Sequence, residues 1–201
     1  MIKMIDLASS IANFSKINTE IKLSSLVKIS GDNGSGKTSL IKILAGLSTY
    51  YTGQILINDY NLRCNIEEFK KNLQVVFAQN GLYEDLTVEE NIKLFSRRWS
   101  GADLTNAGIS VFGLEKYRFT KVKKLSSGFQ RKVLLAKLIA CPSNIWIIDE
   151  IDSYLDSSSL ALLKDVVIQR VKNYGIVFYT AHSDYLSDIN NQEILLNPQL
   201  N

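Results

Sequence analysis

The chain has 201 residues, of which 46% are hydrophobic and 21% charged, and its formal net charge is +3. This length fits one domain with a small inserted part, and the composition excludes a disordered chain or a polybasic nucleic-acid-binding tail. No apolar run approaches the roughly 20 residues of a membrane span, and the N-terminal segment lacks the apolar core of a signal peptide, so we expect a cytoplasmic chain with reduced cysteines.

Short apolar runs alternate with segments of helical periodicity. The expected strands are residues 26–30, 54–58, 73–78, 145–148 and 176–180, and the expected helices are residues 39–47, 91–98, 128–140 and 160–171. Residues 87–90, Thr-Val-Glu-Glu, have the form of a capping box at a helix start. Buried strands that alternate with helices predict an α/β fold with a mainly parallel sheet covered on both faces. The helical character of residues 81–141 indicates a helical subdomain inserted into a core of about residues 1–80 and 142–201, within one domain.

The clearest motif is residues 31–38, Gly-Asp-Asn-Gly-Ser-Gly-Lys-Thr, which lie between an expected strand and an expected helix. This segment satisfies the phosphate-loop pattern. The glycines allow backbone N–H groups to surround a β-phosphate, and the following helix directs its positive end at the anion. Lys37 would reach the β- and γ-phosphates, and the Thr38 hydroxyl would bind Mg²⁺. The alternative is an ordinary glycine-rich turn between a strand and a helix.

A second motif is the apolar run of residues 145–148 that ends in Asp149 and Glu150. Ligands of open α/β sheets bind at the carboxyl ends of the strands, where these two carboxylates are expected. Asp149 would hold Mg²⁺ through its water shell, and Glu150 would orient or deprotonate the attacking water. Read alone, the pair also fits a helix N-cap. The phosphate loop elsewhere in the chain favours the functional interpretation.

A third motif is residues 125–130, Leu-Ser-Ser-Gly-Phe-Gln, which come directly before an expected helix. The motif order resembles that of ABC transporter ATP-binding subunits: the phosphate loop, Gln79, residues 125–130, the Asp149-Glu150 pair, residues 153–156 and His182. The resemblance covers nearly the whole chain. It implies a P-loop NTPase core of the RecA type with a mainly parallel sheet, a small antiparallel β part and the inserted helical subdomain.

The resemblance also implies a role for each matching residue. Gln79 would sense Mg²⁺ and the attacking water, and His182 would contact the γ-phosphate. Ser126 and the N–H of Gly128 would form a second anion site that closes on the ATP of a partner, which gives a head-to-tail homodimer with two ATP molecules in the interface. Asp156 would lie in the segment that links the two sites. Read alone, Gln79 fits a turn, His182 an ordinary surface or core residue, and Ser126 and Asp156 helix N-caps.

The candidate site residues fall into three groups. The nucleotide-binding candidates are Gly31, Asp32, Asn33, Gly34, Ser35, Gly36, Lys37, Thr38, Ser39, Ser126, Ser127, Gly128 and Asp156. The catalytic candidates are Glu150, His182 and Gln79, and the magnesium candidates are Thr38, Gln79 and Asp149. The expected ligands are therefore ATP and Mg²⁺.

Some positions depart from the family pattern. Ser127 stands where the family has a second glycine, Phe129 where it has glutamine, and Ile151 where proline is common. The aromatic residue that stacks on adenine in the family has no clear counterpart. Phe14 is the nearest aromatic before the phosphate loop, and we expect it to be buried, which leaves the source of adenine recognition open.

Within the family, the chain most resembles the ATP-binding subunits of haem exporters for c-type cytochrome biogenesis. The similarity lies in the short end after His182, the stretch of residues 137–150 and the serine in the signature. It implies a peripheral location on the cytoplasmic side of the inner membrane, with a CcmB-like membrane subunit and CcmC- and CcmD-like proteins as partners. The alternatives are the ATPase of a lipid, lipoprotein or drug transporter, and a soluble ABC protein acting on DNA or ribosomes. The charge of +3 offers no electrostatic footprint for nucleic acid, so we expect none as a partner.

Overall fold

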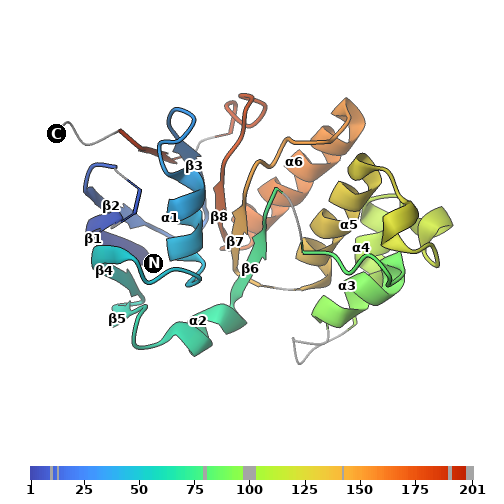
Figure 1. The fold of residues 1–201 in the computed structure, drawn as a ribbon, viewed down its shortest axis with the longest axis horizontal. Helices are drawn as coiled ribbons and strands as arrows, with labels where there is room; N and C mark the ends of the chain where they lie inside the picture. Colours follow the sequence, from blue (N-terminus) through green and yellow to red (C-terminus); the bar gives the residue numbers. More distant parts are fainter. Residues whose placement is uncertain are drawn as a thin grey trace.

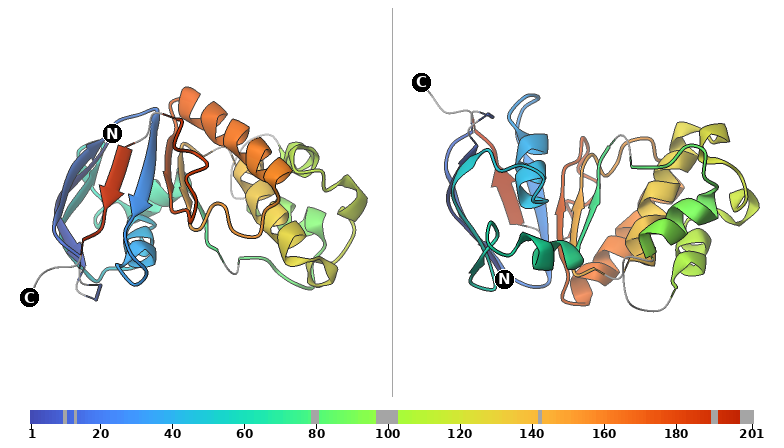
Figure 2. Two further views of the ribbon diagram at one scale, coloured as in Figure 1. Left: turned by 90° about the horizontal axis from the view of Figure 1, so that it is seen from above. Right: turned by 60° about the horizontal axis from the view of Figure 1, so that its bottom comes forward.

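The computed structural model describes residues 1–9, 11–12, 14–78, 81–96, 103–141, 143–189 and 192–197. Its strands form two sheets, with helices packed between and beside them (Figure 1). Seen from above, an antiparallel sheet, a parallel sheet and a group of helices follow one another across the molecule (Figure 2). In the part of the chain that is described, no helix is long and apolar enough to span a membrane.

The parallel sheet has five strands in the order β6-β7-β8-β3-β9. These are β6 (Leu73–Val76), β7 (Ile145–Ile148), β8 (Ile176–Tyr179), β3 (Ser25–Ser30) and β9 (Gln192–Leu195). All four pairings are parallel, and every residue of the central strands β7 and β8 is buried. Complete burial explains why both strands are continuous apolar runs in the sequence.

The smaller sheet is antiparallel, with the order β2-β1-β4-β5. Its strands are β1 (Ile2–Ser9), β2 (Ile17–Ile21), β4 (Tyr51–Ile57) and β5 (Tyr60–Asn61). Helix α1 (Lys37–Leu44) packs between the two sheets, and one buried cluster joins Met4 of β1, Leu40 of α1 and Val27 of β3. This packing places the start of α1 at the carboxyl edge of the parallel sheet.

The other face of the parallel sheet is covered by helices. These are α3 (Val88–Ser96), α4 (Thr105–Val111), α5 (Ser127–Ala140) and α6 (Ser157–Lys172), with short 3-10 turns at Glu115–Tyr117 and Val122–Lys124. A second buried cluster joins them to the sheet through Trp146 and Ile148 of β7. Helix α2 (Ile66–Lys71) precedes β6. The parallel sheet covered on both faces confirms the predicted fold class.

Most expected elements are present with shifted ends, and several were not predicted. The expected helix at residues 39–47 begins earlier, at Lys37, and ends at Leu44, because Gly46 has a φ of 65° and stops the helix. Strands β1, β2, β5 and β9 and helices α2 and α4 were not predicted as separate elements, although α4 lies within the predicted helical residues 81–141. Strand β1 contains a register shift between Met4 and Leu7, with Asp6 at a φ of 47°, which breaks the alternation that marks a half-buried strand. The boundaries of a helical subdomain remain a prediction.

Candidate functional site

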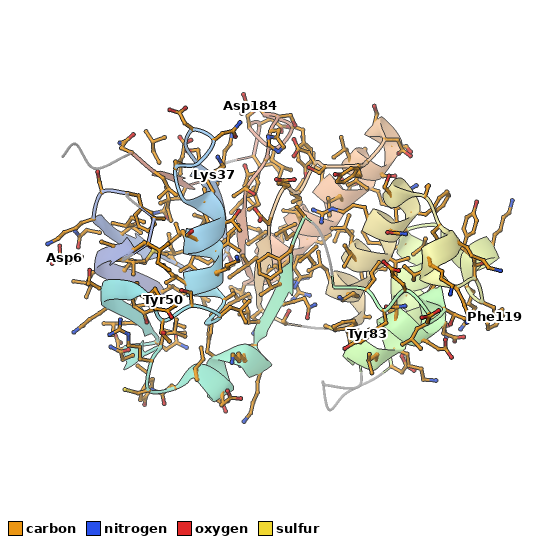
Figure 3. The ribbon with its side chains drawn as sticks, in the orientation of Figure 1. Asp6, Lys37, Tyr50, Tyr83, Phe119 and Asp184 are labelled. Carbon is orange, nitrogen blue, oxygen red and sulfur yellow. The ribbon has the colours of Figure 1, made fainter. Side chains whose placement is uncertain are left out.

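The phosphate loop connects β3 to α1 as the sequence predicts. Gly31, Gly34 and Gly36 have φ values of 140°, 83° and 99°, which other residues rarely adopt. A Cβ atom on Gly36 would lie 2.8 Å from the Cβ of Ala12, so the loop also needs the missing side chain for space. Lys37, labelled in Figure 3, turns its ammonium back toward the loop and donates to the Gly31 carbonyl at 2.7 Å. The loop therefore presents a cation and a helix N-terminus at one point.

Asp149 lies beside the phosphate loop because β7 is separated from β3 only by β8. Its side chain is 5% exposed. Thr38 donates its hydroxyl to Asp149 Oδ2 at 3.3 Å, and Thr180, which directly follows β8, donates to Asp149 Oδ1 at 2.6 Å. The ends of adjacent strands thus bring together the Thr38 hydroxyl of α1, the Asp149 carboxylate directly after β7 and the Thr180 hydroxyl directly after β8.

Glu150 is held in a turn with a φ of 47°, an uncommon value for a residue with a side chain. Its N–H donates to the Thr180 hydroxyl at 2.7 Å, so this one hydroxyl contacts both acidic residues. The carboxylate is 42% exposed and accepts a hydrogen bond from Ser153 at 3.1 Å. His182 Nε2 lies 3.7 Å from the other carboxylate oxygen. The Glu150 carboxylate therefore faces solvent in the same place as His182.

The loop that carries His182 is fixed by Asp152. The N–H groups of His182 and Ser183 both donate to the Asp152 carboxylate, and the Ser183 hydroxyl donates to it at 2.6 Å. Burial by itself would raise the pKa of Asp152, but the hydrogen bonds from Ser183 and His182 outweigh it and hold that pKa below its ordinary value. The ionised Asp152 thus ties the loop after β8 to the turn after β7.

Arg131 of α5 supports the two acidic residues from behind. Its side chain is 1% exposed, and its guanidinium donates to the carbonyls of Phe77, Asp149 and Glu150 at 2.7, 2.9 and 2.7 Å. Burial lowers the pKa of Arg131, and the nearby charges of Asp149 and Glu150 oppose that effect. This arginine was not predicted as a site residue, although it follows the signature motif directly.

A pocket of about 490 Å³ opens where these elements meet. It is lined by Ile11, Ala12, Asn33, Gly34, Gly36, Lys37, Thr38, Ser39, Asp149, Glu150, Thr180, Ala181 and His182. Seven of the predicted nucleotide or metal candidates and two of the catalytic ones are therefore in one pocket. Gln79, a catalytic and metal candidate, lies outside the described residues. Thr180 was missed, because a threonine at the end of an apolar run carries no motif of its own.

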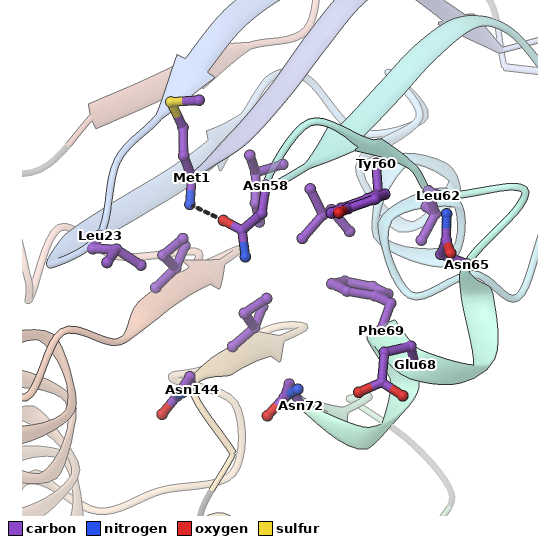
Figure 4. Close-up of a pocket in the computed structure, with 14 residues that line it drawn as sticks. Met1, Leu23, Asn58, Tyr60, Leu62, Asn65, Glu68, Phe69, Asn72 and Asn144 are labelled. Carbon is purple, nitrogen blue, oxygen red and sulfur yellow. Dashed lines mark hydrogen bonds between the residues drawn. The ribbon is translucent and has the colours of Figure 1, made fainter.

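A second cavity, of about 470 Å³, lies at the opposite ends of the strands, beside Ile145 and Ile176 (Figure 4). Its walls are largely apolar and include Phe69, and Asn58, which also lines it, accepts a hydrogen bond from the Met1 amine at 3.0 Å. Among the described residues that line it, no lysine, arginine or histidine is present, and the Met1 ammonium is already bonded to Asn58. A polyphosphate therefore fits the pocket at the carboxyl ends of the strands, and not this cavity.

The signature residues Ser126, Ser127 and Gly128 lie at the start of α5. Ser126 is the N-cap, and its hydroxyl accepts from the Phe129 N–H at 3.4 Å, so the N-cap reading is confirmed. None of the three is among the described residues that line the phosphate pocket. Phe129, the departure from the family pattern, packs against Tyr117 with ring centroids 4.3 Å apart. One chain alone does not bring the signature to its own phosphate loop.

Asp156 is the N-cap of α6, as predicted. Its carboxylate accepts hydrogen bonds from the hydroxyls of Ser159 and Ser158 and from the Ser159 N–H, and these bonds hold its pKa well below the ordinary value. Lys132 of α5 lies 3.6 Å away. Asp156 does not line the phosphate pocket within the described part of the chain. A role across a dimer interface remains a prediction.

Phe14 is 1% exposed and packs beneath the phosphate loop, where a Cβ on Gly36 would lie 3.0 Å from its ring. The expectation that Phe14 is buried is confirmed. Ile11 and Ala12 are the hydrophobic residues of this segment that line the pocket. Adenine contact at this side of the pocket would therefore involve aliphatic side chains.

The oxygen atoms of Thr38 and Asp149 suit a magnesium ion. Mg²⁺ prefers hard oxygen ligands and keeps several waters, so a phosphate-loop site needs few protein groups. Within the described residues, no cluster of three or more histidine, cysteine, aspartate or glutamate side chains could hold a metal. The pair of a hydroxyl and a carboxylate, 3.3 Å apart at the loop, fits an ion that arrives with a nucleotide.

Comparison with known proteins places these features in a family. Residues 14–153 match the family model described as ABC transporter. The cytochrome c biogenesis ATP-binding export protein CcmA of Rickettsia conorii is 34% identical over 184 residues, which cover 91% of this chain and 93% of that protein. The protein of the same name from Shewanella oneidensis is 36% identical over 174 residues, covering 85% of this chain and 80% of that protein.

Solved structures support the fold. The structure of an ATP-binding subunit of an ABC transporter superposes with a TM-score of 0.88 at 22% identity, covering 98% of this chain and 86% of the other. A dimeric ATP-binding cassette in a post-hydrolysis state, bound to ADP and Pi, gives a TM-score of 0.85 at 22% identity, with 98% and 94% covered. At this identity the likeness shows the fold alone.

Proposed function

The chain belongs to the ABC transporter family as an ATP-binding, ATP-hydrolysing subunit, and we propose that its transporter exports haem for c-type cytochrome biogenesis. Two relatives named for that process align with this chain over most of its length and over most of their own lengths. The observation that carries the ATPase proposal is the pocket that brings Lys37, Thr38, Asp149 and Glu150 together.

The phosphate loop binds the triphosphate in this proposal. Backbone N–H groups of residues 31–38 and the start of α1 surround the β-phosphate, and the Lys37 ammonium exchanges its carbonyl partners for phosphate oxygens. Thr38 would hold Mg²⁺ through its hydroxyl and Asp149 through the water shell of the ion, and the bound ion would neutralise phosphate charge. Thr180 keeps Asp149 oriented through a 2.6 Å hydrogen bond.

Glu150 orients or deprotonates the attacking water. Its carboxylate is exposed to the pocket, while its backbone is held by the Thr180 hydroxyl and by Arg131. Such anchoring matters because a misplacement of about 1 Å can slow a reaction about 100-fold. His182, 3.7 Å from Glu150, contacts the γ-phosphate, and the Asp152 carboxylate positions the loop that carries it.

A homodimer completes each ATP site. Ser126, Ser127 and Gly128 present a hydroxyl and helix N–H groups, which suit an anion, but they lie away from the pocket of their own chain. A head-to-tail partner would bring them to the γ-phosphate, with Asp156 in the segment between the two sites. We propose that this dimer is peripheral to the cytoplasmic face of the inner membrane and binds a CcmB-like subunit with CcmC- and CcmD-like proteins.

The test is to isolate the native complex from membranes with a tagged chain and to identify its polytopic subunits. We expect a CcmB-like subunit, and cells that carry Glu150→Gln should lose the absorption of c-type cytochromes while b-type cytochromes remain. Arg170→Lys, a substitution on α6 away from the pocket, serves as the matched control. A different membrane subunit, or normal c-type cytochromes in the Glu150→Gln cells, would contradict haem export but leave the ATPase assignment standing.

A further inference from the structure

We propose that Arg131 of α5, with Lys137 holding the same helix to Gly81, acts as a clamp that makes the position of the turn of residues 149–153 depend on the position of the signature helix. The clamp would couple the ATP site of one chain to the ATP site that the same chain completes for its partner. This inference rests on the proposed function, since it assumes that the start of α5 meets a partner's nucleotide. Both residues are positioning residues, because neither lines the phosphate pocket among the described residues.

Arg131 is the stronger half of the clamp. Its planar guanidinium reaches two separate segments, the Phe77 carbonyl after β6 and the carbonyls of Asp149 and Glu150 after β7. Lysine has a single nitrogen and cannot reproduce this fork. These carbonyls lie beyond the ends of their strands, and the Glu150 carbonyl also accepts a hydrogen bond from the Ser153 N–H at 3.0 Å. The position of the Glu150 backbone therefore depends on α5 as well as on Thr180, whose hydroxyl accepts a hydrogen bond from the Glu150 N–H.

Lys137 is the second half, nearer the end of the same helix. It is 3% exposed, and its ammonium donates to the Gly81 carbonyl at 2.8 Å and lies 3.3 Å from the centroid of the Phe95 ring. Burial lowers its pKa to about 8. Phe77 and Gly81 stand on either side of residues 79 and 80 in the sequence, so α5 holds the chain before and after that point.

The chemistry of the clamp favours a functional role. A buried cation that is hydrogen-bonded only to neutral carbonyls has lost its hydration, which costs free energy. Where buried ionic groups are replaced by apolar residues of similar volume, the folded state is often equally stable. Two such cations on one helix are therefore weak evidence for a purely stabilising role. Both instead join α5 to backbone groups of other segments, and one of them reaches the proposed catalytic residue.

The path from one ATP site to the other is short. Ser126, Ser127 and Gly128 begin α5, and Arg131 follows within about one turn of the same helix. A helix transmits a shift of its first turn with little loss because its backbone is hydrogen-bonded throughout. The neighbouring ion pair of Lys132 and Asp156, at 3.6 Å, is exposed at the Asp156 side and is a weaker connection.

The first test is steady-state ATP hydrolysis by the purified chain. In Arg131→Lys and Arg131→Met we expect kcat to fall about tenfold, with KM for ATP within about twofold, because Glu150 loses one of its anchors while the phosphate loop is untouched. Lys137→Met should lower kcat by a smaller factor, with little change in the unfolding midpoint. Arg170→Lys is the control, since Arg170 is a partly buried cation that stacks on Trp146 and touches neither segment.

The second test measures the coupling itself by hydrogen exchange with Mg²⁺ and the non-hydrolysable analogue AMP-PNP. In the wild type, added analogue should protect both the start of α5 and residues 149–153. In Arg131→Lys it should protect the start of α5 as in the wild type, whereas the protection of residues 149–153 should fall to the part that nucleotide in the chain's own pocket gives directly, because Asp149 and Glu150 line that pocket. A residue needed only for folding would change exchange in both segments with or without the analogue.

Two results would overturn the clamp: Arg131→Lys with wild-type kcat, or undiminished protection of residues 149–153 in that variant. If both Arg131 variants fail to fold, Ser126→Ala decides, because it weakens the proposed contact of α5 with the partner's nucleotide without touching the turn. Protection of residues 149–153 should then fall together with that of the start of α5, and undiminished protection of the turn would overturn the clamp. A wild-type chain that neither hydrolyses ATP nor responds to the analogue would instead contradict the proposed function. The two failures are therefore distinguishable.

Discussion

The phosphate loop and the turn of residues 149–153 face the same pocket but are built in different ways. The loop takes its shape from its own glycines, from the strand before it and from the helix after it. The turn is held by side chains from distant segments: Thr180 after β8, Arg131 on α5, and Ser183, which bonds to Asp152. The loop is a local structure that binds phosphate, whereas the turn is a tertiary structure that responds to its neighbours.

This difference suits the two tasks. A phosphate group needs a fixed array of N–H donors and a cation, and short-range backbone geometry can supply both. Catalysis that waits for a dimer needs a carboxylate whose position depends on the rest of the molecule. Substitutions in the loop should therefore change ATP affinity, and substitutions around the turn should change turnover.

The largest expected effect is that of Glu150→Gln on turnover. Glutamine keeps the shape and the backbone bonds of the turn but cannot accept a proton, so kcat should fall about 100-fold or more while ATP binding remains. Gel filtration with ATP should then show a trapped dimer. Hydrolysis at the wild-type rate would refute the assignment of Glu150 as the base.

Lys37→Ala tests the phosphate loop, the other of the two regions. Loss of a charged hydrogen bond to phosphate is worth about 1.5–3 kcal/mol, so ATP affinity should fall about 10- to 100-fold. Titration with a fluorescent ATP analogue measures this. Unchanged affinity would show that the ammonium does not leave its contacts with the Gly31 and Asp32 carbonyls for the nucleotide.

Two glycine substitutions separate backbone strain from close packing within the loop. Both Gly34 and Gly36 have positive φ, so alanine at either costs about 1–2 kcal/mol of strain. Only at Gly36 does a Cβ also collide with Ala12 and Phe14; at Gly34 it meets no described atom within 4 Å. Gly36→Ala should therefore weaken ATP binding about tenfold more than Gly34→Ala, at about 1.4 kcal/mol for each factor of ten. Equal effects would show that the contact with Phe14 is unimportant.

Thr180→Val tests the support of the turn. Valine has nearly the same shape but leaves Asp149 and the Glu150 N–H without their shared hydroxyl. We expect kcat to fall about tenfold, because a lost hydrogen bond to a buried carboxylate is worth about 1.5–3 kcal/mol. Thr180→Ser keeps the hydroxyl and should retain most of the activity. A Ser variant as slow as the Val variant would point to packing and not to the hydrogen bonds.

The smallest expected effect is the pH dependence that Asp152 contributes. Its folded-state pKa is lowered, so its stabilising contribution is present at neutral pH and is lost as pH falls below the ordinary value of 3.8. The free energy of unfolding should therefore decline less steeply with acid in Asp152→Asn than in the wild type. Urea unfolding at a series of pH values measures the slope, and Asp165→Asn on the exposed side of α6 is the control. Identical slopes in all three proteins would refute the contribution.

Part of the fold was predictable because it is local. The parallel strands β7 and β8 are buried on both faces and appear as apolar runs, and the capping box predicted at residues 87–90 is confirmed by reciprocal hydrogen bonds between Thr87 and Glu90. Strand β2 was not predictable in the same way, since only two of its five residues are buried. Its place depends on pairing with β1 and not on its own pattern.

The same distinction between local and tertiary structure applies to the site. The sequence by itself determined the phosphate loop and the acidic pair that follows β7. A glycine-rich loop and a strand buried on both faces each require particular residue types at adjacent positions, and such patterns can be recognised in the sequence. Only the tertiary structure decided that Thr180 joins Asp149 to Glu150 and that Arg131 holds both from behind. Those contacts arise from the order of strands in the sheet and from the packing of α5, which connect residues far apart in the chain.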